Sequence, residues 1–298
     1  MRLIKRVVDI IFFKNTWSIS YFFLPLGFHN LPDEINIDKD QINIANSADP
    51  FFFLYKNIPY LIYEKISTIG NKGYICLLNL ETRNEKLVLK TKYNLSFPSI
   101  HHINNEIILI CECSESKELK FWKLNNNFQA VEEKNIINEP ILDPVLLTKD
   151  KNFYLIGSLR NKKNDYRPTI YKSQDFINWS KFEDANIYIN KGDERNAGQP
   201  YFIENNIYRF SQILEPKYGS GIKMHRVSQN EPSAYKETLT KEIRMSKISK
   251  SDGIHTISFD KNGFYYDFRM RTFNLFAIFY KFIALLRKKY IKLSLAKT

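Results

Sequence analysis

Two short apolar runs separated by a polar dipeptide recur along the chain, and the first example spans residues 48–64. It reads Ala-Asp-Pro-Phe-Phe-Phe-Leu-Tyr, then Lys-Asn, then Ile-Pro-Tyr-Leu-Ile-Tyr-Glu. Apolar runs of this length around a turn dipeptide predict a β-hairpin whose strands are largely buried. Because the first strand of a hairpin begins where the second one finishes, we expect Asp49 and Glu64 at one rim.

The same pattern occurs four more times, at intervals of roughly 46 to 56 residues. The further copies occupy residues 97–112, 143–158, 199–212 and 255–267. The first four copies carry proline at one register, where the first residue of a strand gives up no interior ladder bond, and the fifth carries Thr256. A hairpin repeated at this interval is typical of the four-stranded blades of a propeller.

Weaker strand signals follow the first four hairpins and predict the outer half of each blade. They pair residues 73–80 with 86–89, 119–124 with 129–131, 169–173 with 179–182, and 222–226 with 235–239. No such pair follows the fifth hairpin, so we expect residues 17–23 and 35–44 to supply its outer strands and close the ring. The prediction is an all-β, five-bladed β-propeller closed by N-terminal strands. A β-sandwich is the alternative, although it would not need one hairpin template five times.

The apolar spacing becomes helical near the C-terminus. Phe273, Phe276, Phe279, Phe282, Ile283 and Leu286 recur at this spacing and are followed by Arg287, Lys288, Lys289 and Lys292. Residues 271–298 are therefore predicted as a basic amphipathic helix, residues 15–270 as the propeller, and residues 1–14 as a basic amphipathic N-terminal segment. Both ends either pack on the propeller or lie on an anionic membrane surface.

The formal net charge of +12 is concentrated at the two ends, because residues 271–298 carry seven Lys or Arg and no acid. The body of the chain is close to neutral, which argues against a nucleic-acid partner. The N-terminus starts like a signal peptide, but Asp9 and Lys14 interrupt it and no small-residue cleavage site follows. We read it as uncleaved and expect a cytoplasmic protein, peripheral on the inner face of the membrane. Cys76, Cys111 and Cys113 are expected as buried free thiols.

With the five hairpins in register, their rim positions can be compared. Asp49, Phe97, Asp143, Gln199 and His255 begin the first strands, and Glu64, Glu112, Ser158, Gln212 and Asp267 or a neighbour end the second strands. The inner strands of a propeller line its axis, so these residues are expected in one central funnel. Four of them are acids from the first three blades, and clustered carboxylates push their pKa values apart, as an acid/base pair requires. The structural alternative is that an acid at a strand start accepts backbone amides.

The fourth and fifth blades add other candidates. Glu194 and Arg195 precede the fourth hairpin, and Arg195 either reads an anion on a ligand or neutralises the acids beside it. Tyr218-Gly219-Ser220-Gly221 ends a loop after the fourth hairpin, and its two glycines permit close approach of a ligand. His255 either binds a sugar hydroxyl, carries a proton, or is structural. No metal-ligand spacing or nucleophile motif is present, so we expect no cofactor and no metal.

These residues resemble a known family. Ala48-Asp49-Pro50-Phe51, Asp143-Pro144, Arg195-x-Ala197-Gly198-x-Pro200 and His255-Thr256 resemble the propeller region before the transferase domain of plant glucosamine inositolphosphorylceramide transferases. Similar bacterial proteins occur near surface-polysaccharide genes, and the propeller glycoside hydrolases of families 43, 32 and 68 are more distantly similar. The resemblance covers roughly residues 17–267.

The resemblance implies roles for some of the rim acids. In the hydrolase families an Asp opening the first blade is base or nucleophile and an Asp opening the third positions the sugar, and Asp49 and Asp143 match these positions. The family 43 general acid is a Glu opening the fourth blade, where this chain has Gln199, which cannot donate a proton for leaving-group departure. Either Glu112, Glu64 or Glu194 takes that role, or the protein is not a conventional hydrolase.

The leading hypothesis is a carbohydrate-active enzyme that makes or breaks glycosidic bonds of a surface glycan or of its lipid-linked or nucleotide-sugar precursor. Asp49 would be base or nucleophile, Asp143 the orienting carboxylate and Glu112 a substitute acid. Glu64, Glu194, Arg195, Gln199, Tyr218 and His255 would bind substrate. Transfer and hydrolysis both remain open. The second hypothesis is a non-catalytic glycan-binding or scaffold propeller, tethered to a membrane or to a transferase partner.

Overall fold

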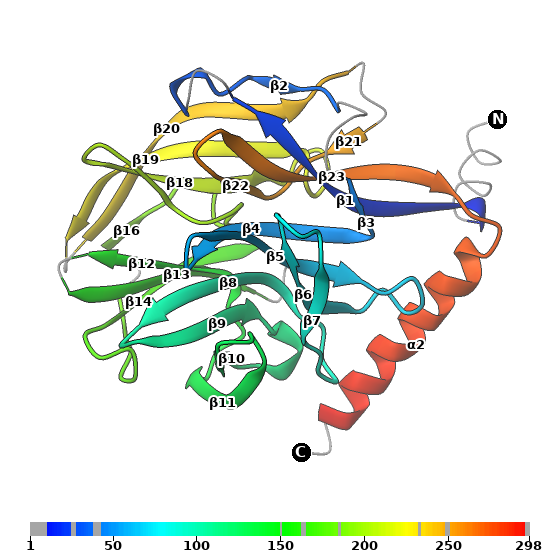
Figure 1. The fold of residues 1–298 in the computed structure, drawn as a ribbon, viewed down its shortest axis with the longest axis horizontal. Coiled ribbons are helices and arrows are strands. Elements are labelled where there is room, and N and C mark those ends of the chain that lie inside the picture. Colours follow the sequence, from blue (N-terminus) through cyan, green and yellow to red (C-terminus); the bar gives the residue numbers. More distant parts are fainter. Residues whose placement is uncertain are drawn as a thin grey trace.

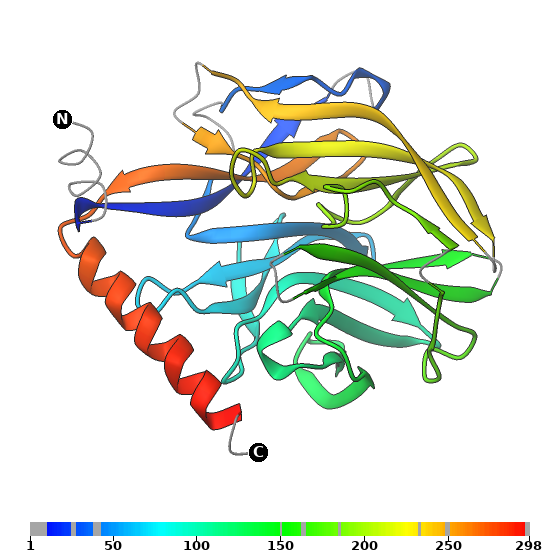
Figure 2. The same cartoon turned by 180° about the vertical axis from the view of Figure 1, so that it is seen from behind.

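The computed structural model describes residues 11–24, 28–37, 43–149, 151–161, 165–183, 186–231, 234–247 and 251–295. Five β-sheets surround one axis, and helix α2 (Ala277–Leu295) follows the last strand, as Figures 1 and 2 show from two sides. The predicted five-bladed propeller with a C-terminal helix is confirmed. Within the described ranges, no helix has the length and apolar character needed to cross a membrane.

Each of the first three blades is a four-stranded antiparallel sheet that grows outward from its predicted hairpin. The first contains β4 (Ser47–Tyr55), β5 (Ile58–Ile66), β6 (Gly73–Asn79) and β7 (Glu85–Leu89). The second contains β8 (Ser96–Ile103), β9 (Glu106–Glu112), β10 (Leu119–Leu124) and β11 (Ala130–Ile137). The third contains β12 (Leu142–Lys149), β13 (Asn152–Arg160), β14 (Tyr166–Ser173) and β15 (Ser180–Lys181).

The fourth blade has two additional short strands. Its antiparallel path is β17 (Tyr201–Ile203), β18 (Asn206–Ile213), β19 (Gly221–Glu231) and β20 (Ala234–Met245). β16 (Ile187–Tyr188) and β2 (Glu34–Ile35) pair with β20 in parallel. The predicted outer strand pair is therefore present, and β20 is covered by short segments from elsewhere in the chain.

The fifth blade is closed by a strand from the N-terminus, as predicted. It is built on β22 (Ile257–Phe259) and β23 (Gly263–Phe273), with β21 (Ser251–Gly253) pairing at the end of β23. The closing strand β1 (Phe13–Phe23) pairs with β23 in an antiparallel ladder along its whole length. β1 and β23 therefore join the two ends of the chain in one sheet and leave no open gap between the first and last blades.

Residues 35–44 were predicted to supply an outer strand of the fifth blade, and this is correct only at their C-terminal end. Ile44 lies in β3 (Ile44–Ala45), which pairs with β1, whereas Ile35 lies in β2 and belongs to the fourth blade. Ile35 is fully buried in the apolar cluster shared by the fourth and fifth blades, which accounts for its place there. Residues 38–42 of the predicted strand lie outside the described residues.

The ladder of β1 and β23 extends past the predicted domain boundaries. β1 begins at Phe13 and β23 ends at Phe273, because these two residues pair with each other at the end of the ladder. Helix α2 begins at Ala277, six residues after the predicted boundary at 271. Residues 1–10 of the predicted N-terminal segment lie outside the described ranges.

Candidate functional site

The rim of the central funnel is built by a β-bulge that the first three blades share. One extra residue stands in the first strand of each hairpin, and φ is 52° at Asp49, 52° at Phe97 and 46° at Asp143. Positive φ strains any residue other than glycine, and it persists where the surrounding structure over-determines the backbone. At this rim the strained backbone is held by carboxylates, which accept hydrogen bonds from the bulge amides.

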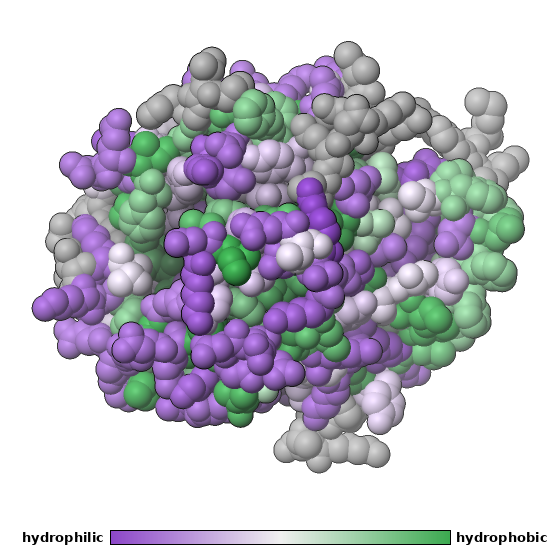
Figure 3. Space-filling view, viewed as in Figure 1, coloured by the Kyte–Doolittle hydropathy of each residue, from purple (hydrophilic) through white to green (hydrophobic). Residues whose placement is uncertain are grey.

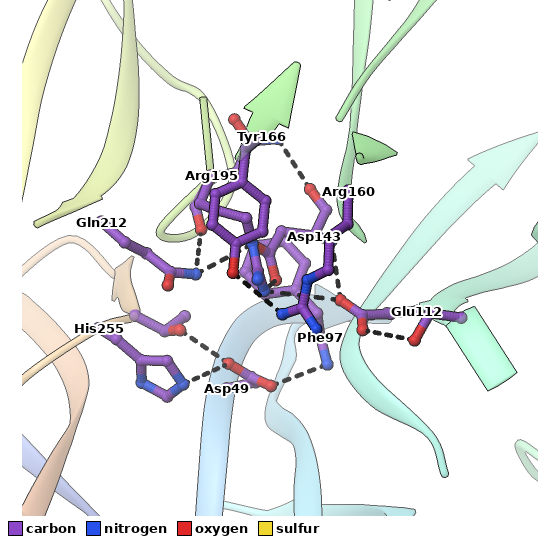
Figure 4. A network of polar contacts seen from close by, with 12 residues as sticks. Asp49, Phe97, Glu112, Asp143, Arg160, Tyr166, Arg195, Gln212 and His255 are labelled. Carbon is purple, nitrogen blue, oxygen red and sulfur yellow. Dashed lines mark hydrogen bonds and ion pairs between the residues drawn. The ribbon is translucent and has the colours of Figure 1, made fainter. Parts of the chain in front are cut away.

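Each bulge amide is bound by a carboxylate of the preceding blade. Asp267 of the fifth blade accepts the Asp49 amide at 3.0 Å, and Asp49 accepts the Phe97 amide at 2.9 Å. Glu112 accepts the Asp143 amide at 3.0 Å. Figure 4 shows the last two of these carboxylates beside the amides they bind. The rim acids therefore accept backbone amides, which is the structural alternative given above, and these hydrogen bonds join neighbouring blades.

Asp49 and Glu64 form a buried carboxyl pair at the first blade. Glu64 stands opposite Ala48 in the hairpin register, so the two acids lie at one end of the hairpin as predicted. Burial, and then repulsion by Asp49, raises the pKa of Glu64 well above its usual range, while burial raises the pKa of Asp49 to about 6. Burial and the neighbouring carboxylate therefore both favour the protonated form of Glu64. The pair also requires Gly73, because a Cβ there would clash with Glu64 Oε1.

His255 lies between two buried aspartates. Its Nδ1 is 2.6 Å from Asp267 and its Nε2 is 3.6 Å from Asp49. Burial by itself lowers an imidazole pKa, but the two carboxylates outweigh it and raise the pKa of His255 above the usual value. Thr256 Oγ1 donates to Asp49 at 2.8 Å. Both ring nitrogens of His255 thus face protein carboxylates, which favours the structural alternative for this residue.

Within the part of the chain that the structure describes, Asp49, His255 and Asp267 form a group of possible metal ligands. Asp49, His255 and Asp267 each offer one ligand atom, and these atoms lie within 4.8 Å of one another. Asp267 Oδ1 already accepts the amides of His255 and Thr256 at 3.0 Å, and Asp267 Oδ2 faces His255 Nδ1. Both oxygens of Asp49 also accept hydrogen bonds, so the carboxylates of this group are engaged within the protein.

Asp143 is held by the fourth blade. Arg195 Nη2 donates to Asp143 Oδ1 at 2.8 Å while Arg195 Nε binds Oδ2, and Gln212 Nε2 donates to Oδ2 at 3.0 Å. Arg195 and Asp143 are both buried, and a bidentate guanidinium–carboxylate pair is among the strongest of protein hydrogen-bonding arrangements. Of the two roles predicted for Arg195, it neutralises an acid, although that acid is Asp143 rather than its neighbours in sequence.

A cavity of about 640 Å³ opens at this network. It is lined by Asn94, Glu112, Ser114, Pro140, Leu142, Arg160, Arg195 and Tyr218. Glu112 is the one carboxylate among these lining residues, with Ser114 Oγ donating to its Oε1 at 3.1 Å and Arg195 Nη2 lying 3.8 Å from its Oε2. Burial, and then repulsion by Asp143, raises the pKa of Glu112 to about 7. A carboxyl group that titrates near neutral pH can both donate and accept a proton in a reaction.

Aromatic rings surround the guanidinium of Arg195. The Arg195 guanidinium carbon is 5.1 Å from the centre of the Tyr166 ring and 5.9 Å from that of Tyr218. Arg160 donates to the Tyr166 hydroxyl at 3.0 Å (Figure 4). Trp17, from the closing strand β1, stacks on His255 with ring centres 4.1 Å apart. Of these rings, that of Tyr218 lines the cavity.

The structure corrects the register predicted for the fourth blade. The Gln212 amide donates to the Arg195 carbonyl and Asn196 pairs with Ser211, so Arg195 and Asn196 stand at the rim. Two extra residues bulge between Asn196 and Tyr201 and move Gln199 away from this position. The bulge contains Gly198 at φ 129°, where a Cβ would clash with the Ile257 carbonyl.

Glu194 has a local contact in the structure. It is buried, and its carboxylate accepts the amide of Gly192 at 2.9 Å. Of the residues predicted for the site, Asp49, Glu64, Glu112, Asp143, Arg195, Tyr218 and His255 are brought together. Trp17, Arg160, Tyr166 and Asn196 join them without having been predicted.

A second polar cluster inside the fourth blade has the order of a hydrolytic triad. Ser211 Oγ is 2.8 Å from His225 Nε2, and His225 Nδ1 is 3.5 Å from Glu237. All three are buried, and burial lowers the pKa of His225 to about 4. Arg209 is paired with Glu237 and donates to Asn196 at 2.9 Å. The cluster therefore supports the rim from below and offers no nucleophile to a substrate.

Solved structures of other proteins share the propeller fold. The β-xylosidase RS223 superposes with a TM-score of 0.53 at 10% identity, over 76% of this chain and 92% of that chain. A family GH43_1 enzyme from Xanthomonas citri, solved with xylotriose, gives 0.53 at 10% identity, over 76% and 87%. At these identities the likeness concerns the fold.

The chain belongs to the family described as glucosamine inositolphosphorylceramide transferase 1, N-terminal, whose model matches residues 36–257. Proteins named glucosamine inositolphosphorylceramide transferase 1 from Arabidopsis thaliana and from Oryza sativa subsp. indica are 26% identical over 202 and 204 residues. These matches cover 64% of this chain but 26% and 27% of the relatives. The predicted resemblance is confirmed, and the chain spans about a quarter of the length of these curated relatives.

The raised pKa values of the rim acids predict that stability falls as pH rises. Asp49 titrates at about 6 in the folded protein against an ordinary value of 3.8, and Glu112 at about 7 against 4.5. The folded state therefore binds more protons than the unfolded chain between these values. The favourable contribution of Asp49 and Glu112 to the free energy of unfolding is therefore complete below their ordinary pKa values. This contribution is lost as pH rises through their pKa values in the folded protein, about 6 and about 7. His255, whose pKa is also raised, acts in the same direction.

Urea unfolding at about pH 5 and about pH 7.5 checks this expectation. The midpoint concentration should be lower at the higher pH, and Glu112→Gln, which removes one of the titrating groups, should reduce the difference. An equal or higher midpoint at about pH 7.5 would contradict the assignment of raised pKa values.

Proposed function

We propose that this propeller is carbohydrate-active and that it binds a glycan or an activated sugar in the funnel cavity, where a glycosidic bond is transferred or hydrolysed. The observation that carries the proposal is the presence of Glu112, with a pKa of about 7, beside Arg195 on the wall of a cavity of about 640 Å³. Membership of the glucosamine inositolphosphorylceramide transferase 1 N-terminal family, and a fold shared with a β-xylosidase, support the same class.

In the proposed reaction Glu112 is the proton carrier. As the bond between the anomeric carbon and the leaving oxygen breaks, its electron pair stays on that oxygen and the Glu112 proton joins it. An acceptor hydroxyl or water then forms the new bond to the anomeric carbon and gives its own proton to the Glu112 carboxylate. Arg195 and Tyr218, on the same cavity wall, would bind the sugar or an attached anionic group.

We place this reaction in the synthesis of a surface polysaccharide or glycolipid, in the cytoplasm. The transferase named in the family description supports synthesis over breakdown. All three cysteines are free and buried, which suits a reducing compartment. Fractionation of cells that express the full-length protein would test this placement, and recovery from the cell exterior would contradict it.

A second candidate function is glycan binding without catalysis. The observation that favours it is the engagement of Asp49 and Asp143, because both oxygens of each carboxylate already accept hydrogen bonds from the protein. In the hydrolase families the matching acids act on the sugar, whereas these two hold the blades together. Glu112 would then bind a hydroxyl instead of moving a proton.

Substitution of Glu112 by Gln separates the two candidates. Binding of xylotriose and of nucleotide-activated glucosamine is followed by saturation-transfer NMR. Turnover of an aryl xyloside, and transfer to inositolphosphorylceramide, are followed by mass spectrometry. We expect turnover of one probe by the wild type, a large loss of that turnover in Glu112→Gln, and retained binding. Turnover that is unchanged in Glu112→Gln, with binding intact, would contradict catalysis by Glu112; binding without turnover of any probe by the wild type would favour the second candidate.

A further inference from the structure

We propose that α2 and the turn before it form a membrane-docking surface, which lies on an anionic lipid bilayer and turns the cavity face of the propeller toward it. Docking itself is independent of the proposed reaction. The consequence for substrate access rests on the proposed function.

One side of α2 is packed against the propeller. Ala277 is fully buried, Lys281 Nζ donates to the Phe13 carbonyl at 2.8 Å, and Arg287 pairs with Glu115 at 2.8 Å. Ile283 and Arg287 also lie close to Gly70 in the loop between β5 and β6. These contacts fix the orientation of the helix, so its opposite side faces solvent.

The opposite side carries large apolar side chains. Phe279 is 54% exposed and Leu285 is 66% exposed, and others join them on the helix and the turn before it: Leu275, Phe276, Phe282 and Leu286. Figure 3 shows apolar side chains gathered at the right of the molecule, over the end of β23 and α2. A contiguous apolar surface of this kind on a folded domain marks a site of interaction.

The charges of α2 identify the occupant as an anionic lipid surface. The helix contains five Lys or Arg residues and no acid; Lys281 and Arg287 contact the propeller, and Lys289 is exposed. A basic helix with exposed aromatic and aliphatic residues lies in the interface of a bilayer, where its cations meet anionic headgroups. Self-association through α2 would instead bring two sets of like charges together, which disfavours a second copy of the chain as the occupant.

The position of α2 relates this surface to the cavity. Helix α2 follows β23, the second strand of the fifth hairpin, and the second strands end at the rim where the cavity opens. Glu115, the partner of Arg287, belongs to the 3₁₀ turn η2 (Ser114–Ser116), whose Ser114 lines the cavity and donates to Glu112. Figure 1 shows α2 across that end of the propeller. A sugar headgroup attached to a lipid would therefore meet the cavity at the membrane surface.

Vesicle flotation tests the docking surface. The full chain should float with vesicles of phosphatidylcholine and phosphatidylglycerol, remain unbound with phosphatidylcholine alone, and be released by high salt. The double variant Phe279→Glu/Phe282→Glu should reduce the bound fraction by about tenfold or more, because both side chains would have to enter the interface as acids. Phe202→Glu is the matched control, since Phe202 is 55% exposed on β17 and far from α2 in sequence, and its binding should equal that of the wild type.

Two results would overturn the docking proposal. One is absence of binding to the anionic vesicles, or equal binding by the wild type and the double variant. The other is a dimer in analytical ultracentrifugation that the double variant converts to monomer, which would make α2 a self-association surface.

A pair of spin labels on the second blade tests the orientation. Lys117 lies at the end of η2 on the cavity side, and Asn105 lies in the hairpin turn on the opposite side, and both are exposed. With anionic vesicles, a nitroxide at Lys117→Cys should become less accessible to a water-soluble relaxation agent, while one at Asn105→Cys should not change. Equal changes at both positions would contradict the orientation. Because neither assay measures turnover, their failure is distinguishable from failure of the proposed reaction.

Discussion

Replacement of Glu112 by Gln is expected to lower turnover by roughly 10²–10⁴-fold, the usual contribution of a positioned acid or base. The substituted side chain keeps a carbonyl oxygen that can accept the Asp143 amide, so the bond between the second and third blades is retained. The variant cannot donate a proton to a leaving group. The change should therefore appear in kcat with little change in KM, because the shape of the cavity and its hydrogen-bonding groups are preserved.

The pH profile gives this prediction a second measurement. If Glu112 acts as the acid, wild-type turnover should fall as pH rises above about 7, where its carboxyl group loses the proton. Glu118→Gln is the control, since Glu118 lies on the same blade in a partly exposed pair with Lys120, and its profile should match the wild type. A Glu112→Gln variant with wild-type kcat and the same pH profile would remove Glu112 from the mechanism.

The fold was predictable because one hairpin pattern occurs five times and each copy buries the same faces. The turn dipeptides and the prolines fixed the register in the first three blades, where the structure adds one bulge residue to each. The fourth blade was not predictable in register, because its two-residue bulge depends on Gly198 packing against the Ile257 carbonyl of the fifth blade. Ile35 joined the fourth blade for a similar reason, since its partners come from distant strands.

The site was predictable where its residues come from the repeated hairpins. Asp49 and Asp143 stand near the start of the first strand, and Glu64 and Glu112 near the end of the second strand, in hairpins of the first three blades, so register alone placed them together. Trp17, Arg160 and Tyr166 could not be found in this way, because the first comes from the closing strand and the other two flank the loop between β13 and β14. The pairing of Arg195 with Asp143 also needs the folded rim, since it joins residues of two different blades.

The bonds between blades explain why the carboxylates are both numerous and buried at the rim. Each bulge places a strained residue at positive φ, and the carboxylate of the preceding blade binds its amide. Two of these carboxylates, Asp49 and Glu112, and Glu64 beside Asp49 are buried, and burial together with their mutual repulsion raises the pKa of all three. A proton-carrying group in the cavity is thus a consequence of how the ring is closed, and activity and stability should share their dependence on pH.

Removal of the Asp267 carboxylate tests the ring itself. Asp267→Ala is expected to lower the free energy of unfolding by about 3–5 kcal/mol, as happens when one partner of a buried ion pair is removed. Asp267 is fully buried, accepts the amides of Asp49, His255 and Thr256, and faces the imidazole of His255. Without it, three buried amides and the buried imidazole of His255 lose their partner, and the fifth blade loses its bond to the first.

Urea unfolding at neutral pH measures this loss, and an exposed ion pair provides the control. Glu106→Gln breaks the pair of Glu106 with Lys123, whose side chains are partly exposed, and should change stability by no more than about 1 kcal/mol. Asp267→Asn should be intermediate, because its amide oxygen accepts hydrogen bonds but carries no charge for His255. If Asp267→Ala costs no more than the Glu106 control, the carboxylates do not hold the blades together. The raised pKa values of Asp49, Glu64 and Glu112 would then not be a consequence of how the propeller is closed.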